Sequence, residues 1–321
     1  MKKFFISGQT LFGLLFCLSF CLWTALMPTA ESAEKQTQEK WRLDAMQGAV
    51  LPRSLRFMTD EFTVSVEPLP PRAGLDALRC SASAEFSGRG LPLIKEKILA
   101  HAGQDAVIYI VDLRKESHGF VNGDIPVSSY AKRNWGNRGL STAEVSQAEE
   151  KLLRSIVGRK LTFVPKGGTD TKILTECTTK VEQAETESSI AAKNGMRYKR
   201  IAVTDQAAPT AENIDEFMAF YAQLPPKAWL HFHCHAGHGR TTSFVVFYDI
   251  LRNPDMTLED IAARQYALGG TDLLHPDEKK AWKIEEARKR AEQIRKFYAY
   301  VQAERGANFN RTFSQWIQEQ E

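Results

Sequence analysis

Short runs of β-branched and aromatic residues alternate along the chain with longer amphipathic stretches. Such runs are typical of strands, because branched and aromatic side chains pack well on a pleated surface. The strands predicted in this way are AVIYIVDLR (106–114), LTFVP (161–165), MRYKRIAV (196–203) and AWLHFHC (228–234). Apolar strands that alternate with amphipathic helices predict an α/β protein with a mainly parallel central sheet flanked by helices.

Capping residues and helix breakers delimit the amphipathic stretches. Thr210 can cap a helix over 211–224, and Thr257 can cap one over 258–268. Two further helices are predicted, over 243–251 and 276–304.

The N-terminus has the layout of an export signal. Lys2 and Lys3 precede an apolar stretch over 11–27, and small and polar residues follow at 28–33. We therefore expect residues 1–33 to be removed as a signal peptide, which predicts a periplasmic or secreted protein without an integral membrane domain. The alternative is an N-terminal membrane anchor, because 17 largely apolar residues are nearly enough to span a bilayer.

Behind this segment we expect a flexible, charged lead-in over 34–48 and one folded domain over 49–321. The region around 158–195 is rich in Thr, Lys and Glu and lacks long helical patterns, so it is predicted to be a small β insert. A chain of 321 residues that is 43% hydrophobic can bury one large core or one core with an embedded subdomain.

The formal net charge is only +3. There is no long basic tract and no repeat of basic and aromatic residues, so the sequence does not indicate a nucleic-acid-binding protein. A polyanionic ligand would have to be held by a local cationic pocket, because the whole protein offers little electrostatic steering.

Three cysteines follow the signal: Cys80, Cys177 and Cys234. Because their number is odd, at least one thiol is free or shared between chains. Cys80 and Cys177 can form a disulfide in an oxidising compartment, but we favour the alternative that they are unrelated structural cysteines.

The segment HFHCHAGHGRTTSF (231–244) combines four of the seven histidines with Cys234, two glycines and Arg240. A zinc site would need three or four His or Cys side chains to converge, whereas adjacent side chains on a strand point apart. Arg240 also places a permanent positive charge beside the cluster. A metal is therefore disfavoured, and no cofactor is expected.

An anion-binding loop explains more of these residues. The strand predicted over 228–234 leads into a loop that ends at Arg240, and a helix follows directly. Gly237 and Gly239 permit backbone conformations in which successive N–H groups point inward at an anion, and the helix N-terminus adds further N–H groups. Arg240 offers a planar fork for two phosphate oxygens. These positive surroundings should lower the pKa of Cys234 and make it a nucleophile aimed at phosphorus.

Cys-x5-Arg after a hydrophobic strand is the signature loop of the protein tyrosine phosphatase superfamily, which HCHAGHGRT (233–241) closely resembles. The resemblance implies that Cys234 attacks the phosphoryl group, Arg240 stabilises the transition state and Thr241 assists breakdown of the phosphocysteine. His233 would hold the loop and tune the thiol; alternatively, it is a buried structural histidine. The loop residues expected to meet the substrate are His235, Ala236, Gly237, His238 and Gly239.

Such chemistry also needs a general acid, because an alkoxide is a poor leaving group unless it is protonated as the P–O bond breaks. The best candidate is Asp205, which follows the strand predicted over 196–203, lies in a loop with Pro209 and precedes Cys234 by 29 residues. The alternative is a turn or capping aspartate.

The resemblance extends to a specific family, the bacterial cysteine phytases, or protein tyrosine phosphatase-like inositol polyphosphatases. The segments that carry it are LPRSLR (51–56), VDLRKESHGFVNGDIPVSSY (111–130), GMRYKRIAVTD (195–205), PTAENIDEFMAFYAQLP (209–225), AWLHFHC (228–234) and the stretch from RQYALGG to FYAYVQ (264–302). The resemblance implies a phosphatase domain with a small partial β-barrel. It also implies stepwise removal of phosphates from inositol hexakisphosphate without metal, with Asp205 as the acid.

The family also implies cations around the other phosphates of the substrate. Arg56, Lys283 and Arg290 fall where the family places them. Lys283 and Arg290 are seven residues apart on a predicted helix, so they share one face.

Three positions depart from the family pattern. Gln206 stands where a His often follows the acid, Lys166 is the one basic residue kept from a basic stretch of the insert, and Ala287 stands at an aromatic position. Gln206 and Lys166 are still expected to contact the substrate. These departures bear on affinity and on the order of phosphate removal, not on the reaction class.

Polar residues gather at the end of the strand predicted over 106–114, where an open α/β sheet forms its crevice. We expect Glu116 and His118 to support the acid loop or Arg240. The alternative is an internal ion-pair network with no catalytic part.

Two other functions fit part of the sequence. A phosphotyrosine or phosphoinositide phosphatase would share the loop, and an exported enzyme could act after delivery into another cell. A silent phosphate-binding module would need neither a nucleophile nor an acid, so Cys234 and Asp205 argue against it.

Overall fold

A five-stranded central sheet contains three of the four predicted strands. Its order is β10 (Arg197–Val203), β4 (Val107–Arg114), β11 (Ala228–His233), β3 (Cys80–Ser83) and β2 (Arg56–Phe57). The first four run parallel, and β2 pairs antiparallel with β3 at one edge. All of β11 is buried, as expected for a parallel strand covered on both faces. The predicted α/β class with a mainly parallel sheet is confirmed.

The computed structural model describes residues 40–165 and 170–320. The expected signal over 1–33 and the predicted substrate residue Lys166 lie outside these ranges. Within them, no helix combines the length and the apolar character needed to cross a membrane.

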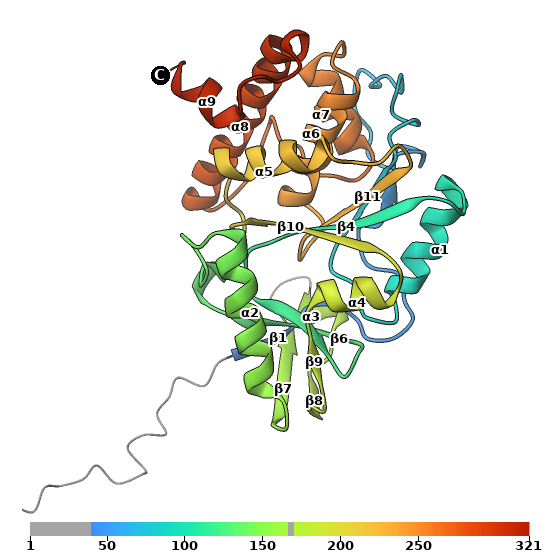
Figure 1. Cartoon of the computed structure of the whole chain (residues 1–321), viewed down its shortest axis with the longest axis vertical. Helices are drawn as coiled ribbons and strands as arrows, with labels where there is room; N and C mark the ends of the chain where they lie inside the picture. Colours follow the sequence, from blue (N-terminus) through green and yellow to red (C-terminus); the bar gives the residue numbers. More distant parts are fainter. Residues whose placement is uncertain (1–39, 166–169, 321) are drawn as a thin grey trace, which may run out of the picture. The chain divides into compact units, whose positions relative to one another are not determined.

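Helices cover both faces of the central sheet (Figure 1). One face carries α5 (Ala211–Tyr221), α6 (Gly239–Arg252), α7 (Leu258–Ala267), α8 (Ala281–Glu304) and α9 (Phe313–Gln318). The other carries α1 (Leu91–Ala102) and α4 (Glu187–Lys193). Val111 and Leu113 of β4 pack toward the first set and Ile108 and Ile110 toward the second, so alternate side chains of one strand join two cores.

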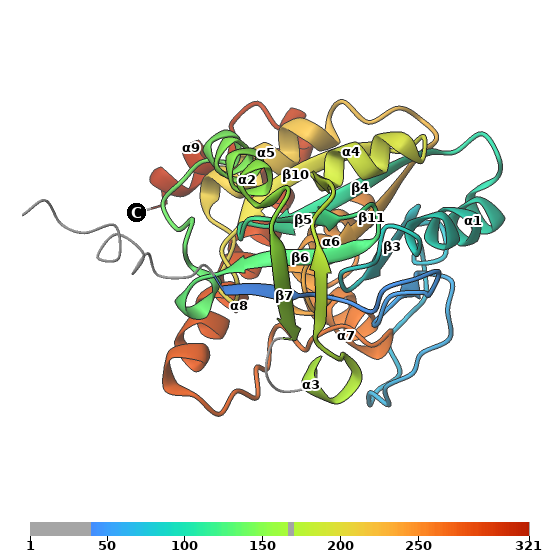
Figure 2. The ribbon, with the colours of Figure 1, turned by 90° about the horizontal axis from the view of Figure 1, so that it is seen from below.

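A second, six-stranded sheet adjoins this layer structure. Its order is β8 (Cys177–Lys180), β7 (Lys160–Pro165), β1 (Lys40–Leu43), β6 (Ile125–Tyr130), β5 (His118–Val121) and β9 (Ala184–Glu185). The helix α2 (Thr142–Ile156), the short helix α3 (Asp170–Ile173) and the 3₁₀ turn η2 (Lys132–Asn134) lie around it. A further 3₁₀ turn, η3 (Arg305–Ala307), follows α8. Seen from below, its strands change direction strongly, as in a partial barrel (Figure 2).

The second sheet corrects two predictions about chain organisation. The predicted insert over 158–195 supplies β7, β8 and β9, whereas β1, β5 and β6 come from earlier in the chain. The lead-in expected to be flexible over 34–48 contains β1, whose Trp41 and Leu43 are buried in the core of this sheet. The charged composition of the segment did not indicate a strand. Two apolar side chains at alternating positions are nevertheless enough to make one face of a strand apolar.

Local chemistry located the helices well. The hydroxyls of Thr210 and Thr257 accept the backbone N–H groups of Asn213 and Asp260, as expected for N-caps. α8 begins at Ala281, five residues later than predicted, because residues 277–280 are all charged and offer no apolar side chain that could pack on the core.

The three cysteines within the described residues are free thiols. Cys80 lies in the central sheet and Cys177 in the second, so the two sulfurs belong to different layers. The disulfide considered from the sequence is not formed.

A buried arginine ties the two sheets together. Arg114, at the end of β4, is fully buried, and its Nη2 lies 2.8 Å from Asp44 Oδ2 while its Nε lies 3.1 Å from Glu116 Oε1. Its Nη1 also donates to Glu85. Asp44 directly follows β1 and accepts a hydrogen bond from Ser128 of β6 at 2.8 Å. Buried ions are tolerated only when they are paired, so these groups depend on one another.

Replacing Arg114 by Met should therefore lower the free energy of unfolding by about 3–5 kcal/mol, since three buried carboxylates lose their shared counterion. Urea unfolding measures the change. The control is Arg154→Met, which breaks an exposed pair with Glu150 on α2 and should cost no more than about 0.5 kcal/mol. Equally small losses in both variants would contradict the role of Arg114.

Candidate active site

The segment from Cys234 to Arg240 forms the turn between β11 and α6, at the carboxyl end of the central sheet. Gly237 has a φ of +74°, and a Cβ at this position would lie 2.6 Å from the backbone nitrogen of Ala84. A Cβ at Gly239 would lie 2.8 Å from Nη1 of Arg290. Gly237 is thus required for its conformation, as predicted, whereas a Cβ at Gly239 would displace the Arg290 guanidinium.

Cys234 is buried at the base of this turn, with 3% of its surface exposed. Burial alone would raise the pKa of its thiol, but Arg240, the Thr241 hydroxyl and the backbone N–H of Ala236 together hold that pKa below its ordinary value. The buried Thr241 hydroxyl has no nitrogen or oxygen partner among the described residues, which leaves it able to donate to the sulfur. The site therefore favours a thiolate.

Arg240 is fixed by a bidentate ion pair. Its Nη1 and Nη2 lie 2.7 and 3.0 Å from the two carboxylate oxygens of Glu116. Nη2 also lies 2.9 Å from Oδ1 of Asp205, and Nη1 donates to the Val203 carbonyl at 3.2 Å. Although burial opposes its charge, Glu116 and Asp205 hold the pKa of the guanidinium well above its ordinary value. The expected contact between Glu116 and Arg240 is present.

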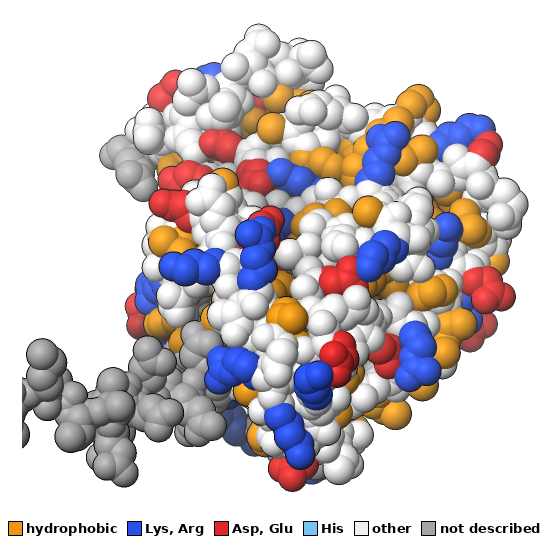
Figure 3. All heavy atoms as spheres, turned by 60° about the horizontal axis from the view of Figure 1, so that its bottom comes forward, with side chains coloured by type: hydrophobic (Ala, Val, Ile, Leu, Met, Phe, Trp, Pro, Cys, Tyr) orange, Lys and Arg blue, Asp and Glu red, His pale blue; other side chains and the backbone are white. Residues whose placement is uncertain are grey.

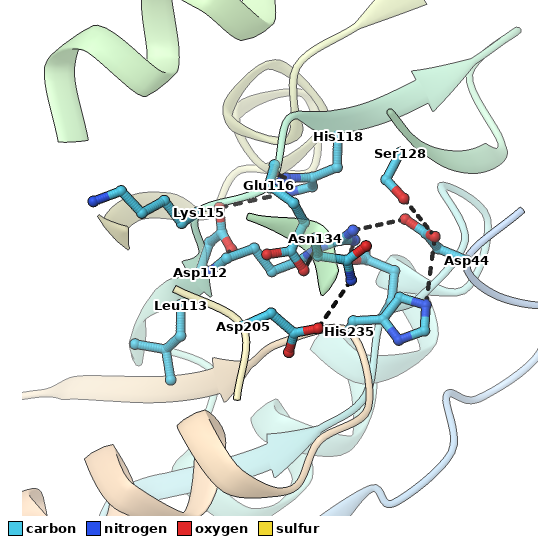
Figure 4. Close-up of polar contacts among 12 residues, drawn as sticks. Asp44, Asp112, Leu113, Lys115, Glu116, His118, Ser128, Asn134, Asp205 and His235 are labelled. Atoms are coloured by element: carbon cyan, nitrogen blue, oxygen red, sulfur yellow. Dashed lines mark hydrogen bonds and ion pairs between the residues drawn. The ribbon is translucent and has the colours of Figure 1, made fainter. Parts of the chain in front are cut away.

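Asp205, the predicted acid, lies on the loop after β10 and faces the turn. Besides Arg240, its carboxylate accepts a hydrogen bond from Asn134 Nδ2 to Oδ2 at 2.9 Å. Its backbone carbonyl accepts one from Trp135 Nε1, also at 2.9 Å. Figure 4 shows Asn134 pointing at Asp205. The sequence patterns did not single out either residue; the available signal was a Trp and an Asn inside the polar segment AKRNWGNRG (131–139).

These groups line one cavity of about 210 Å³. Its wall includes Cys234, Arg240 and Asp205, together with the loop residues His235, Ala236, His238 and Gly239 and the predicted outer residues Gln206, Lys283 and Arg290. Thr271, Glu278 and Ala287, which were not assigned to the site, complete it. Lys283 Nζ is 3.9 Å from the Glu278 carboxylate, and Arg290 donates to the Gln206 carbonyl at 2.7 Å. α8, which is distant in sequence from the turn, thus brings both predicted cations to the loop.

Two predicted substrate contacts are buried more deeply than expected. Arg56 is buried under the turn, where it donates to the Gly237 carbonyl at 3.0 Å and to the Thr242 hydroxyl at 3.3 Å, so it braces the loop and does not line the cavity. The His235 side chain was expected at the rim, but it is buried with Nε2 3.4 Å from Asp44 Oδ1 (Figure 4). Tertiary packing, which residue type does not encode, decided both positions.

Glu187 of α4 links two buried histidines. Its Oε1 lies 2.7 Å from His233 Nε2, and its Oε2 lies 3.2 Å from His118 Nε2. Burial would lower the pKa of His233, but Glu187 outweighs it and raises the pKa to about 9. His118 was expected to support Arg240 or the acid loop; instead it lies in an ion-pair network with Glu187, Asp112 and Glu149.

Two sets of buried side chains in this network lie close enough together to ligate a metal ion. They are Glu85, Glu187 and His233, and Asp112, His118 and Glu187. Each set already contains a carboxylate that pairs with a guanidinium, because Glu85 bonds Arg114 and Asp112 lies 3.2 Å from Arg200. The residues are thus neutralised by protein cations, which favours an ion-pair network over a metal centre.

The chain is similar to several known proteins. Residues 111–252 match the family of protein tyrosine phosphatase-like phytases, whose description names inositol hexakisphosphate. A similarly classed phytase from Bdellovibrio bacteriovorus is 31% identical with a TM-score of 0.68, over 87% of this chain and 94% of that one. A protein tyrosine phosphatase-like myo-inositol phosphatase from Mitsuokella multacida was solved in complex with myo-inositol-(1,3,4,5)-tetrakisphosphate. It is 40% identical to this chain, with a TM-score of 0.80. The latter match covers 87% of this chain and 48% of that chain.

A curated relative, effector protein hopD2 of Pseudomonas syringae pv. tomato, is 30% identical over 173 residues. These residues are 51% of this chain and 37% of that protein. The chain therefore spans less than half the length of both the Mitsuokella structure and the effector.

The raised pKa of His233 predicts a pH dependence of stability. The folded-state pKa of about 9 exceeds the unfolded value of about 6.5, so the protonated imidazole stabilises the fold fully below about pH 6.5. That stability is lost as the pH rises through 9, by up to about 3 kcal/mol. Urea unfolding between pH 6 and 10 should show the decline, and Glu187→Gln should flatten it because the imidazole loses its counterion. Identical slopes in the two proteins would exclude the linkage.

Proposed function

We propose that this chain is an inositol polyphosphate phosphatase. It belongs to the family of protein tyrosine phosphatase-like phytases and has the fold of that family. It would remove phosphates one at a time through a phosphocysteine intermediate. The proposal rests on the observation that Cys234, Arg240 and Asp205 line the same cavity. A nucleophile, a cation for the transition state and an acid for the leaving group are the parts that this reaction needs.

In the first step, the Cys234 thiolate attacks phosphorus as the bond from phosphorus to the inositol oxygen breaks. Arg240 and the backbone N–H groups of the turn bind the phosphoryl oxygens, where negative charge develops. Arrival of the phosphate draws Arg240 away from Asp205 and places negative charge beside the carboxyl, which favours its protonated form. Asp205 then donates its proton to the leaving oxygen, so that an alcohol departs.

In the second step, water attacks the phosphocysteine. Asp205, now a carboxylate, accepts a proton from this water, and inorganic phosphate leaves as the Cys234 thiolate is restored. Thr241 lies beside the sulfur and can donate to it as it departs. His233, held by Glu187, supports the strand end from which Cys234 projects.

Several wall residues suit a polyphosphate rather than a single phosphate. Lys283, Arg290, Gln206 and His238 surround the turn and could bind the neighbouring phosphates of an inositol ring. Figure 3 shows one face of the molecule on which lysine and arginine side chains are spread between acidic and hydrophobic ones. The cationic side chains of that face are thus scattered and not gathered into one large basic patch, in keeping with the small net charge.

The signal-like segment over 1–33 supports export of this enzyme, whose folded domain includes β1 (Lys40–Leu43). Delivery into another cell is a second candidate, because one relative is named an effector protein. Fractionation of the cells that produce the protein shows whether the chain lies in the periplasm, the medium or the membrane. The result distinguishes export, delivery and a retained membrane anchor.

A substrate panel tests the proposed function. We expect kcat/KM to be highest for inositol hexakisphosphate when phosphate release is compared with that from a phosphotyrosine peptide and a phosphoinositide. A preference of more than tenfold for the peptide or the lipid, about 1.4 kcal/mol, would contradict the substrate class.

Cys234→Ser should reduce turnover of inositol hexakisphosphate by about 10⁴-fold or more, since the hydroxyl is not ionised in this site. Binding measured by calorimetry should persist, because Arg240 and the outer cations remain. Cys177→Ser, at the partly buried thiol of β8, is the matched control and should keep full activity. Substantial turnover by Cys234→Ser would exclude the phosphocysteine.

Asp205→Asn should lower kcat for inositol hexakisphosphate by about 100-fold or more, since an alkoxide must be protonated to leave. The loss for p-nitrophenyl phosphate, whose leaving group is stable as an anion, should stay below about tenfold. Equal losses on both substrates would remove Asp205 as the acid.

A further inference from the structure

The segment between β6 and α2 holds Asp205 from the side opposite Arg240. Asn134 is buried and donates to Oδ2 of the carboxylate, while Trp135 donates to the carbonyl of the same residue. Arg42 Nη1 lies 3.4 Å from Asn134 Oδ1, so the carbonyl side of the amide already has a donor and its NH₂ group faces Asp205. Both the side chain and the backbone of Asp205 are thus held by neighbouring residues of one turn.

The backbone of this turn has an unusual conformation. Arg133 and Asn134 are consecutive left-handed residues, with φ of 62° and 61°. Residues with a Cβ rarely adopt this conformation, which persists only where the surroundings impose it. The conformation directs the Asn134 amide into the protein while Arg133 remains exposed.

Aromatic and cationic side chains fix the turn against α8. The Trp135 ring lies edge-on to Trp282 at 5.9 Å, and the Arg133 guanidinium lies 4.5 Å from the Trp282 ring and 5.0 Å from that of Trp135. Arg138 lies 4.4 Å from the Trp135 ring. Trp282 precedes the cavity residue Lys283, so one cluster connects the acid loop to the helix that carries the outer cations.

We propose that Asn134 and Trp135 are positioning residues for proton transfer by Asp205, an inference that rests on the proposed role of Asp205 as the acid. The amide N–H occupies Oδ2, and Arg240 donates to Oδ1. Once the phosphate draws Arg240 away, Oδ1 is the oxygen left to carry the proton of the acid form, and it faces the phosphate site. The indole N–H fixes the backbone, and with it the distance of Oδ1 from the leaving oxygen. Proton transfer is sensitive to such placement.

Asn134→Gly and Trp135→Phe test this inference. Gly tolerates positive φ, so the first variant removes the amide and keeps the turn; Phe keeps the ring and removes the N–H. Each should lower kcat for inositol hexakisphosphate by about tenfold or more, and for p-nitrophenyl phosphate by less than about threefold. Asn137→Ala is the control, because this Asn of the same segment donates to Lys115 and Ser117 and not to Asp205. It should show no such dependence on the leaving group.

A double-mutant comparison separates this inference from the proposed function. In an Asp205→Asn background, adding Asn134→Gly should have little further effect on kcat, since no proton transfer remains to be positioned. Suppose that Asn134→Gly and Trp135→Phe lower kcat equally for both substrates, while the effect of Asp205→Asn depends on the leaving group. That result would overturn the positioning role alone. Loss of that dependence in Asp205→Asn itself would instead overturn the acid assignment.

Discussion

The buried pair between Arg240 and Glu116 is the interaction on which the rest of the site depends. Two parallel hydrogen bonds fix the plane of the guanidinium, which in turn places positive charge beside Cys234 and contacts Asp205. Burial would raise the pKa of Glu116, but Arg240 and Arg114 hold it well below the ordinary value. The carboxylate therefore stays charged in a dry environment because two guanidiniums share it.

This arrangement explains why the second sheet supports the candidate active site. Arg114 can support Glu116 only while Asp44 and Glu85 satisfy its other nitrogens, and Asp44 follows a strand of the second sheet. Glu187 of α4, close in sequence to β9 of the same sheet, pairs with His233, the residue before Cys234. Buried charges from both sheets thus converge behind the turn, and moving one of them would leave its partners unpaired.

The predictions that succeeded rest on short-range chemistry. The strands β4, β10 and β11 follow from branched apolar runs, and the starts of α5 and α7 follow from threonine caps. Predictions that were wrong or incomplete concern side chains whose environment is set by distant segments. Arg56 has the residue type of a phosphate ligand, yet its position under Gly237 makes it a brace for the loop. His235 belongs to the loop, yet Asp44 of another sheet holds its ring.

The sequence by itself determined the α/β architecture and the chemistry of the turn, because the strand, the glycines, the cysteine and the arginine are neighbours in the chain and act through local geometry. It also indicated the acid, through its place after a strand. Only the tertiary structure decided which groups support that chemistry. Glu187, Asn134 and Trp135 act across 46 to 71 residues of chain, and burial makes their pairing specific because an unpaired ion or amide in the interior is costly.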